Sequence, residues 1–443
     1  MTDIHITAEI LRALDSGKVD AESVTQWVLS HLSQICPTCR EELLRFQREP
    51  TEVADDGAAM DDVFARVRRR SADLHRELSD ERQRSREDYQ TLLRLGPGDR
   101  LGRVQRARRR FRSPFLAEAL LRDCRAALPG AAAEARHFSE LAYEVSLRIP
   151  APFQGELMVL SLAHLGNALR ADGELRQARR RLDAARAMAR QQQLVDSLAL
   201  AELDWLEAIL ACDQRRFSAS EALFSRSAVL YQLAEDPVSV ARTLLSASTV
   251  YKETGDLEGA IAAVERAERC LEGLQEPFLS LCAIHNRLFY LAEGGQFGEA
   301  REGLAAVRHR YREFPEPWTQ LRLSWLESKV AAGFDRLAEA TEGFRATRDG
   351  FVAEGKAFDA ALVSLELAAV LMRQGRRREV VEVAEEIRGI FEVQAVHREA
   401  LAALLLLQQA AQEEAVTTGL LADLTQYLER ARRDPQLAFQ QSA

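Results

Sequence analysis

A histidine and two cysteines near the N-terminus have the spacing of zinc ligands. His31, Cys36 and Cys39 form the pattern H-x4-C-x2-C in a stretch whose flanks are predicted to be helical. Zinc prefers four soft or borderline ligands in a tetrahedron. Two cysteines three positions apart, on a turn that enters a helix, direct both sulfurs at one point, and Pro37 suits the first helical position. With His5 as the fourth ligand, these residues predict a structural zinc site.

Two other interpretations of the same residues stay open. The cysteines and the histidine can be ordinary residues of a helix and its turn. Cys-x-x-Cys can also be a redox motif, although that motif is typical of a βαβ setting and the sequence predicts helical flanks.

The sequence contains no recognisable catalytic motif elsewhere. Cys282 and His285 share a face of a predicted helix, but a nucleophile and its base need an orienting group and an oxyanion site as well. The sequence indicates neither, so core packing is the better interpretation. The patterns G-x-x-x-x-G-K-[ST], H-E-x-x-H and G-x-S-x-G are missing. We therefore expect a protein that is not an enzyme and has no catalytic residues.

A repeat organises the second half of the chain. Its marker positions follow one another at a nearly constant step, and they are Leu175, Phe217, Leu257, Phe297, Leu337 and Arg377. Two positions before each marker stand Gly173, Arg215, Gly255, Gly295, Asp335 and Gly375. Three positions after each stand Ala178, Ser220, Ala260, Ala300, Ala340 and Val380. A period of about 40 residues predicts one helix–turn–helix unit, repeated.

Each unit is predicted to be a pair of antiparallel helices. In one of them, apolar or small residues recur at helical spacing from Leu162 to Leu169 and again from Leu175 to Ala185. Gly166 and Ala178 are small enough for the two helices to approach closely. Prolines recur at the same step where a new first helix is predicted to begin, at Pro237, Pro277 and Pro317. One pair alone leaves its apolar face uncovered, so neighbouring pairs must stack.

Composition sets the class of protein. The chain has 443 residues, is 47% hydrophobic and carries a net charge of −9, which argues against general nucleic-acid binding. No signal peptide is recognisable, and the longest apolar run, 401–407, is far shorter than the roughly 20 residues that cross a membrane. Six scattered cysteines indicate a reduced, cytoplasmic protein without membrane contact. We expect an all-α fold with a head at 1–48, a charged helical connector at 49–115 and a solenoid at 116–438.

Seven arginines lie between Arg100 and Arg112. They could contact nucleic-acid phosphates. The favoured interpretation is a solvated helix whose arginines pair with nearby acidic residues, such as Asp80, Glu81, Glu87 and Asp88, so nucleic-acid binding is not expected.

The repeat region resembles the tetratricopeptide repeat (TPR) family. The similarity is carried by Leu-Gly-Asn-Ala-Leu at 165–169 and by Gly173, Ala178, Leu182 and Ala185, and it extends over about 155–395. The family's usual period is about 34 residues, so the longer step of this chain implies longer helices. The resemblance implies a right-handed superhelix whose concave face binds a protein or peptide. The residues that it places in the groove are Asn167, Arg242, Asn286, Arg287 and Lys329.

The head resembles the zinc-binding anti-sigma domain, in which a histidine and H-x3-C-x2-C hold a small helical module. The chain has one extra residue between His31 and Cys36. This resemblance implies a sigma factor as a second partner. Together the two resemblances imply a bacterial, non-enzymatic regulatory adaptor that controls transcription. The alternative is a peptide or small-molecule sensor in which the head is only a structural cap.

Overall fold

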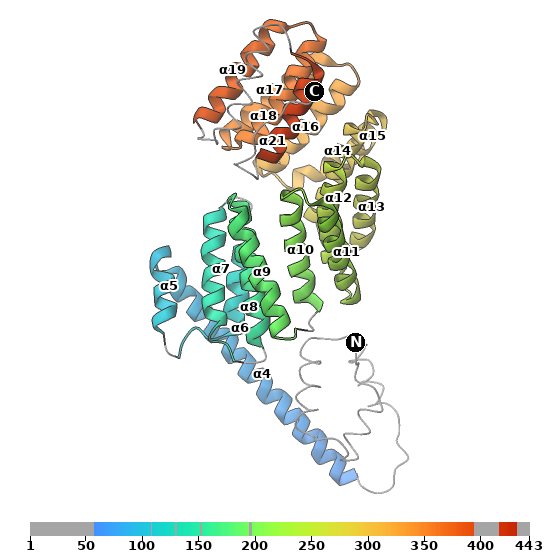
Figure 1. Ribbon diagram of the computed structural model, residues 1–443. Helices are drawn as coiled ribbons and strands as arrows, with labels where there is room; N and C mark the ends of the chain where they lie inside the picture. Colours follow the sequence, from blue (N-terminus) through green and yellow to red (C-terminus); the bar gives the residue numbers. More distant parts are fainter. Residues whose placement is uncertain are drawn as a thin grey trace. The chain divides into compact units, whose positions relative to one another are not determined.

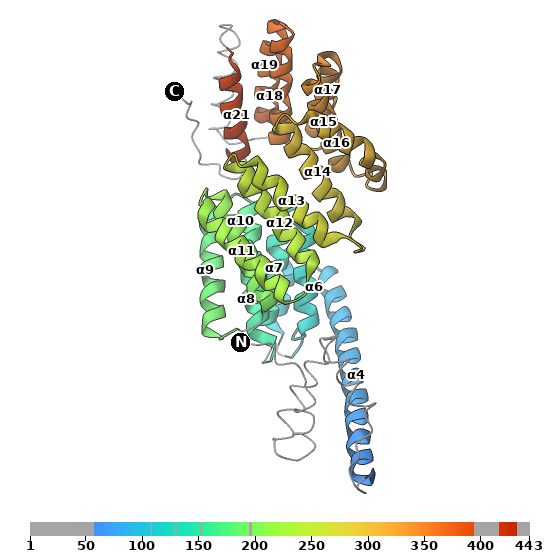
Figure 2. The same cartoon turned by 90° about the vertical axis from the view of Figure 1, so that its right-hand side faces the viewer.

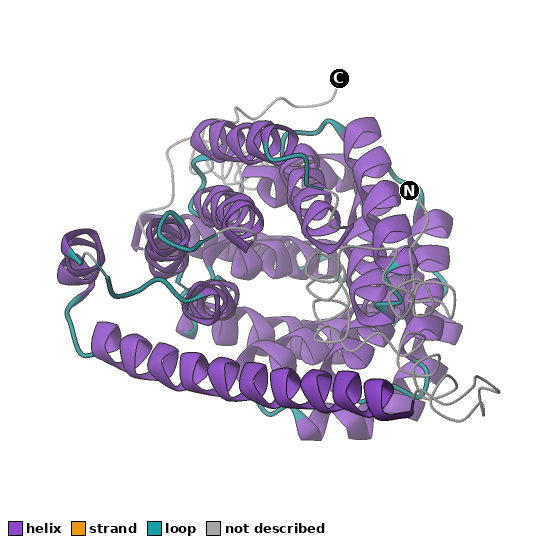
Figure 3. Ribbon diagram, turned by 90° about the horizontal axis from the view of Figure 1, so that it is seen from below, coloured by secondary structure: helices purple, strands orange, loops and turns teal. Residues whose placement is uncertain are grey.

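The computed structural model describes residues 57–107, 109–128, 131–150, 153–194, 197–393 and 416–431. Within these ranges every regular element is a helix (Figure 3). The chain divides into two compact units, Met1–Glu87 and Asp88–Ala443. The predicted boundaries at 48/49 and 115/116 stay predictions. The predicted head lies outside the described residues.

Helix α4 (Gly57–Leu93) is the longest described element. Its sequence is rich in charge, and pairs such as Arg76 with Asp73, 3.1 Å apart, lie one turn apart on its surface. Such exposed pairs add little stability each. This composition agrees with the solvated connector helix that the charge pattern predicts.

The second unit takes in the end of α4 and continues with α5 (Pro97–Arg106), α6 (Pro114–Ala127) and α7 (Ala132–Ser146). These helices share an apolar cluster, and Phe111 is buried in it at 1% exposure. The backbone N–H of Phe111 donates to Asp88 Oδ2 at 3.2 Å, and Arg110 forms an ion pair with the same carboxylate. One of the predicted pairs in the arginine-rich stretch is therefore present.

A series of helix pairs follows, drawn from green to orange in Figure 1. The pairs are α8 (Phe153–Ala171) with α9 (Leu175–Gln191), α10 (Ser197–Asp213) with α11 (Phe217–Leu233), α12 (Pro237–Glu253) with α13 (Leu257–Leu271), α14 (Pro277–Glu293) with α15 (Phe297–Val307), α16 (Pro317–Gly333) with α17 (Leu337–Ala353), and α18 (Ala357–Arg373) with α19 (Arg377–Val393). The 3-10 helix η1 (Arg308–Glu313) extends α15, and α21 (Thr418–Ala431) lies near the end of the chain.

The repeat positions coincide with the helix boundaries. Each of the six markers, from Leu175 to Arg377, is the first residue of a second helix. The residue two positions earlier has a φ between 55° and 83° in every unit. Glycine adopts this left-handed conformation without strain, which explains why it occupies four of the six turns. Arg215 and Asp335 adopt it with a side chain, at φ 55° and 61°.

Small residues allow the two helices of a pair to pack closely. The residue three positions after each marker is at most 3% exposed in all six units. At Ser220 the hydroxyl donates to the carbonyl of Ala208 on the facing helix at 2.7 Å, so a polar residue is satisfied there. A Cβ on Gly166 would lie 2.9 Å from Leu182 Cγ and 3.2 Å from the Ala178 carbonyl oxygen. The predicted roles of Gly166 and Ala178 are therefore confirmed.

The first helices of the pairs form the inner side of the series. Successive first helices contact one another, and these are α8, α10, α12, α14, α16 and α18. Among the described helices, successive first helices approach one another more closely than successive second helices do. Each second helix contacts the first helix of the next pair. A stack whose first helices approach one another more closely than its second helices do must curve toward the first helices. Figure 2 shows the pairs in succession, from α8 and α9 to α18 and α19. The fold is thus an all-α solenoid of the TPR-like type.

Candidate functional site

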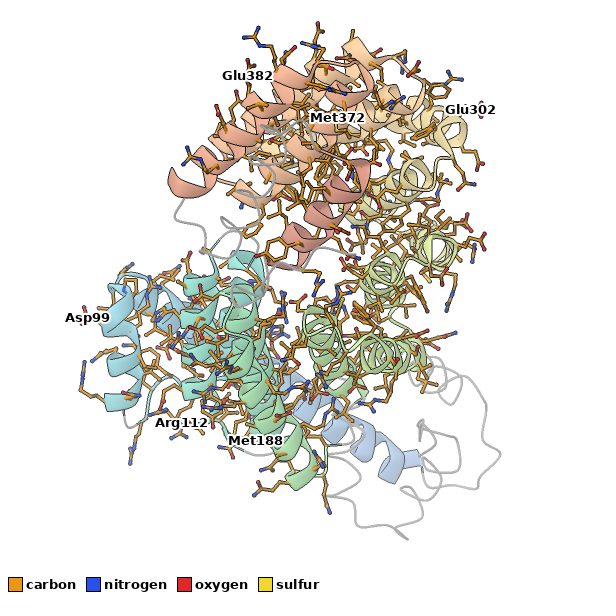
Figure 4. The ribbon with its side chains drawn as sticks, turned by 45° about the horizontal axis from the view of Figure 1, so that its top comes forward. Asp99, Arg112, Met188, Glu302, Met372 and Glu382 are labelled. Atoms are coloured by element: carbon orange, nitrogen blue, oxygen red, sulfur yellow. The ribbon has the colours of Figure 1, made fainter. Side chains whose placement is uncertain are left out.

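We call the surface formed by the first helices the inner face. It carries a row of polar and charged side chains. Figure 4 shows the contrast with the outer side, where Glu302 of α15 and Glu382 of α19 lie at the periphery and Met372 of α18 lies within the series. Because the first helices repeat at a nearly constant step, their equivalent residues are neighbours. Partners on successive first helices are 36 to 43 residues apart.

Glu202 and Arg242 form the ion pair at the start of this row. Arg242 Nη2 lies 2.7 Å from Glu202 Oε2, and the Tyr231 hydroxyl donates to the same oxygen at 2.6 Å. The Arg242 guanidinium also lies over the Trp205 ring, 4.5 Å from its centroid. Burial alone would raise the pKa of the Glu202 carboxyl, but the Arg242 charge and the Tyr231 hydrogen bond hold it below its usual value. The glutamate is therefore ionised and compensated.

His164 joins this pair from α8. Its Nε2 lies 3.5 Å from Glu202 Oε1 and 3.4 Å from Arg125 Nη1 of α6. The histidine is 2% exposed. Burial lowers the pKa of His164 to about 4, with the Arg125 and Arg242 charges acting in the same direction and Glu202 opposing them. At neutral pH the ring is uncharged, and acid would force a charge into a buried position.

The two tryptophans at equivalent places make equivalent hydrogen bonds. Trp205 Nε1 donates to Ser246 Oγ at 3.0 Å, and Trp325 Nε1 donates to Glu366 Oε1 at 3.0 Å. Each acceptor is 41 residues further along, on the next first helix. The tryptophans therefore tie successive units together on the inner face.

Lys329, a predicted groove residue, lies between two carboxylates. Its Nζ is 3.1 Å from Glu366 Oε1 and 3.5 Å from Glu293 Oε1, and it lies 5.1 Å from the centre of the Phe289 ring. Burial would lower the pKa of the Lys329 ammonium, but Glu366 and Glu293 raise it above its usual value. The lysine is charged and its charge is balanced.

A long-range ion pair brings α21 to the same region. Lys252 Nζ of α12 lies 2.5 Å from Glu429 Oε1 of α21, across 177 residues of sequence. The two side chains are 19% and 26% exposed. Helix α21 also packs against α18 through an apolar set that includes Leu421, Leu424 and Leu428.

The two predicted asparagines differ in their surroundings. Asn167 is 3% exposed, and its Oδ1 accepts from Arg170 Nε at 2.8 Å, so this asparagine is buried. Asn286 of α14 accepts from Arg322 Nη2 of α16 at 3.0 Å. Arg287, the last predicted groove residue, pairs with Glu268 of α13 at 2.9 Å and so faces the preceding pair.

Cys282 and His285 both lie on α14. His285 is 4% exposed, and its Nδ1 lies 2.9 Å from the Tyr311 hydroxyl. Burial lowers the pKa of His285 and raises the pKa of the Cys282 thiol. A half-buried neutral thiol and a buried neutral imidazole on one helix agree with the predicted packing role.

The predicted zinc ligands His5, His31, Cys36 and Cys39 lie outside the described residues. In the part of the chain that the structure describes, no group of three or more His, Cys, Asp or Glu side chains is placed to hold a metal ion. A search of the same described residues finds no helix both long enough and apolar enough to span a membrane.

Sequence reasoning did not find His164, Glu202 or Arg322 as part of this surface. A signal for two of them exists, since Glu202, Arg242, Cys282 and Arg322 occupy the same position of four successive repeat units. The predicted residues Arg242, Asn286 and Lys329 lie on the inner face among them, and their role in binding a partner stays a prediction.

Comparisons with known proteins support the fold. No family model matches this sequence, and no match to a curated protein is found. Among solved structures, a Rap protein complexed with competence and sporulation factor superposes with a TM-score of 0.55 at 12% identity, covering 71% of this chain and 87% of that one. The apo form of RapI gives a TM-score of 0.51 at 11% identity, covering 71% and 86%. At these identities the similarity is one of fold.

Proposed function

We propose that this protein is a non-enzymatic regulatory adaptor whose inner face binds a peptide or an extended protein segment. The observation that carries the proposal is the row of half-buried polar and charged groups on successive first helices. An extended chain has an amide at every residue and needs donors and acceptors at regular intervals. Side chains repeated at the same position of stacked helices supply them at such intervals.

The similarity to solved structures supports a role in binding a partner. One of them is a Rap protein complexed with competence and sporulation factor. That complex concerns the Rap protein, and at 12% identity it carries no contact residues over to this chain. It agrees with the interpretation of the inner face as a binding surface, and it makes a small proteinaceous ligand the first class to test.

The test is affinity selection of a random hexapeptide library by the full-length protein, with mass-spectrometric identification of the retained peptides. Lys329→Met on the inner face is expected to reduce retention or change the retained sequences. Arg269→Met, at an exposed position of the second helix α13, is the matched control and is expected to retain the wild-type set. Identical sets for all three proteins, or no retained peptide, would contradict the proposal.

We further propose that the head binds one structural zinc ion and a second partner, a sigma factor, through which the adaptor controls transcription. The support is the H-x4-C-x2-C pattern with His5, together with the resemblance to anti-sigma domains. Purified full-length protein is expected to contain about one zinc per chain. Cys36→Ser combined with Cys39→Ser is expected to lose it. Wild-type protein that carries no zinc, and melts identically to the double variant, would exclude the metal.

The alternative proposal is a sensor of a peptide or small molecule in which the head is only a structural cap. The same zinc-free double variant separates the two proposals. An adaptor loses its sigma-factor partner when the head is unfolded but keeps its peptides. A sensor has no sigma-factor binding to lose, and its ligand affinity is unchanged in the variant.

A further inference from the structure

A cluster of exposed arginines lies outside the series of helix pairs, on α5 and on the segments that flank it. Its members make no ion pair among the described residues, and they are Arg94, Arg103, Arg106, Arg109 and Arg112. Asp99 is the only acidic residue between positions 94 and 112. Figure 4 shows Asp99 and Arg112 at the periphery, on the side of α5. We call these five arginines, together with Leu93 and Leu147, the α5 surface.

The carboxylates of the adjoining helices already have partners, so they do not balance this cluster. Asp88 of α4 forms its ion pair with Arg110. Glu144 of α7 accepts from Arg148 Nη1 at 2.7 Å and from Gln105 Nε2 of α5 at 3.3 Å. The α5 surface therefore carries a local excess of positive charge on a chain whose net charge is −9.

A strained backbone holds the segment 109–113 in place. Phe111 has a φ of 61°, and the other non-glycine residues with a positive φ in the described ranges each lie two positions after a helix of the series. Such a φ costs free energy for a bulky residue. It is kept because the Phe111 ring is 1% exposed and its N–H donates to Asp88 Oδ2 at 3.2 Å. Arg109 and Arg112 are thus exposed on either side of a buried anchor.

An exposed leucine lies beside each end of α5. Leu93 is 40% exposed, and its carbonyl accepts from Arg100 Nη2 at 3.5 Å. Leu147 is 41% exposed and precedes Arg148, whose Nη2 donates to the Gln105 carbonyl at 3.5 Å. Arginine is enriched in protein–protein interfaces, where its guanidinium binds carboxylates in a bidentate geometry. Arginines next to exposed apolar side chains therefore suit a protein partner with both acidic and apolar groups.

A nucleic acid fits the same surface less well. Single strands are bound by stacking of their bases on exposed aromatic rings. The only aromatic residue between positions 94 and 112 is Phe111, which is buried. A duplex is repelled by the chain's net charge of −9, and its phosphate backbone has no apolar group to cover the two leucines.

We propose that the α5 surface binds an acidic segment of a partner protein. Carboxylates of that segment pair with the arginines, and its apolar side chains cover Leu93 and Leu147. None of these residues belongs to the inner face, so the α5 surface is a second protein-binding surface in addition to the one proposed above. The fixed segment around Phe111 keeps Arg109 and Arg112 in place before the partner arrives, which reduces the entropy lost on binding.

The test measures the binding of labelled peptides to the full-length protein by fluorescence anisotropy. The probe is a fluorescein-labelled peptide of repeated Glu-Glu-Leu. It is compared with repeated Glu-Glu-Gly, with repeated Gln-Gln-Leu and with a labelled DNA duplex. Glu-Glu-Leu is expected to bind most tightly and Gln-Gln-Leu most weakly, and the affinity for both acidic peptides should fall as salt is added. No binding of the acidic peptides by wild type would overturn the proposal.

A triple variant tests the arginines. Arg103→Gln combined with Arg109→Gln and Arg112→Gln is expected to bind Glu-Glu-Leu about 10-fold more weakly than wild type, because three exposed charge pairs are lost. All three side chains are exposed, so the fold should not change. Circular dichroism checks that it does not.

A matched variant in α9 controls for the loss of net charge. It combines Arg176→Gln, Arg180→Gln and Arg181→Gln, which are also exposed arginines without an ion pair among the described residues. It removes the same charge and is expected to change the affinity for Glu-Glu-Leu by less than about twofold. An equal loss of affinity in both triple variants, or no loss in either, would overturn the α5 surface.

Two further variants locate the probe. Leu93→Gln combined with Leu147→Gln is expected to remove the preference for Glu-Glu-Leu over Glu-Glu-Gly and to leave the affinity for Glu-Glu-Gly unchanged. Lys329→Met, on the inner face, should bind both peptides as wild type does. A loss in Lys329→Met alone would assign the probe to the inner face and overturn the proposal. DNA that binds more tightly than Glu-Glu-Leu through the same three arginines would overturn it in favour of a nucleic acid.

Discussion

The loss of stability at low pH tests whether His164 is buried and neutral in the charge network of the inner face. The pKa of this residue is about 4 in the folded protein because of burial, against an ordinary value of 6.5. A lowered folded pKa means that the unfolded chain binds the proton more readily. The contribution of neutral His164 to the free energy of unfolding is therefore complete above pH 6.5, and it is lost as the pH falls through about 4.

The magnitude follows from the two values. Between pH 7.5 and pH 5 the unfolded histidine becomes almost fully protonated while the folded one stays mostly neutral. The linkage relation gives a loss of about 2 kcal/mol for this residue alone over that interval. His164→Gln keeps a polar side chain that takes no proton. The loss of unfolding free energy between pH 7.5 and pH 5 is therefore expected to be about 2 kcal/mol smaller in this variant than in wild type, whatever the variant's stability at pH 7.5.

A long repeat array does not unfold in one step, so the readout must be local. Hydrogen exchange of peptides from α8 and α10, corrected for intrinsic rates, gives the opening free energy at both pH values. His309→Gln, at an exposed position of η1, is the control and should show the wild-type loss. If acidification destabilises α8 as much in His164→Gln as in wild type, the buried neutral histidine is the wrong explanation.

Four further substitutions are expected to change local stability in a defined direction, and each is measured by local hydrogen exchange. Gly166→Ala should cost about 1–3 kcal/mol because its Cβ would overlap the facing helix. Gly255→Ala has open space but a φ of +83°, so it should cost about 1 kcal/mol, and no loss there would refute the left-handed turn. Gly389→Ala, in open space within α19, should instead stabilise by about 0.5–1 kcal/mol. Asp204→Asn, 1% exposed and paired with two arginines, should cost about 3 kcal/mol, and a neutral effect would contradict its burial as a charge.

The repeat units were predictable because they depend on local chemistry. A glycine in a left-handed turn, an apolar residue that begins the second helix and a small residue one turn later each leave a trace in the sequence. Arg377 illustrates how far this holds. It is not apolar, yet α19 begins there, because the turn at Gly375 and the buried Val380 are both in place.

The polar network was harder to predict because its partners belong to different units. Arg242 meets a residue 40 positions earlier, and Arg322 meets one 36 positions earlier. The choice between such partners depends on the stagger of successive first helices, which no local pattern encodes. Asn167 shows the same limit. Its burial against Arg170 follows from the neighbouring unit, whose Asp213 lies 2.7 Å from that arginine.

The Lys252–Glu429 pair has a mechanical consequence. An open stack of helix pairs stretches or tightens by small rotations spread over all its units, and its two ends then move freely. A contact between α12 and α21 closes a loop of 177 residues, so the rotations of the units between them must compensate one another while the contact lasts. The rise and rotation between successive helix pairs from α12 to α21 are then constrained by the contact at both ends. Weakening this contact would relax that constraint on the three helix pairs between α12 and α21.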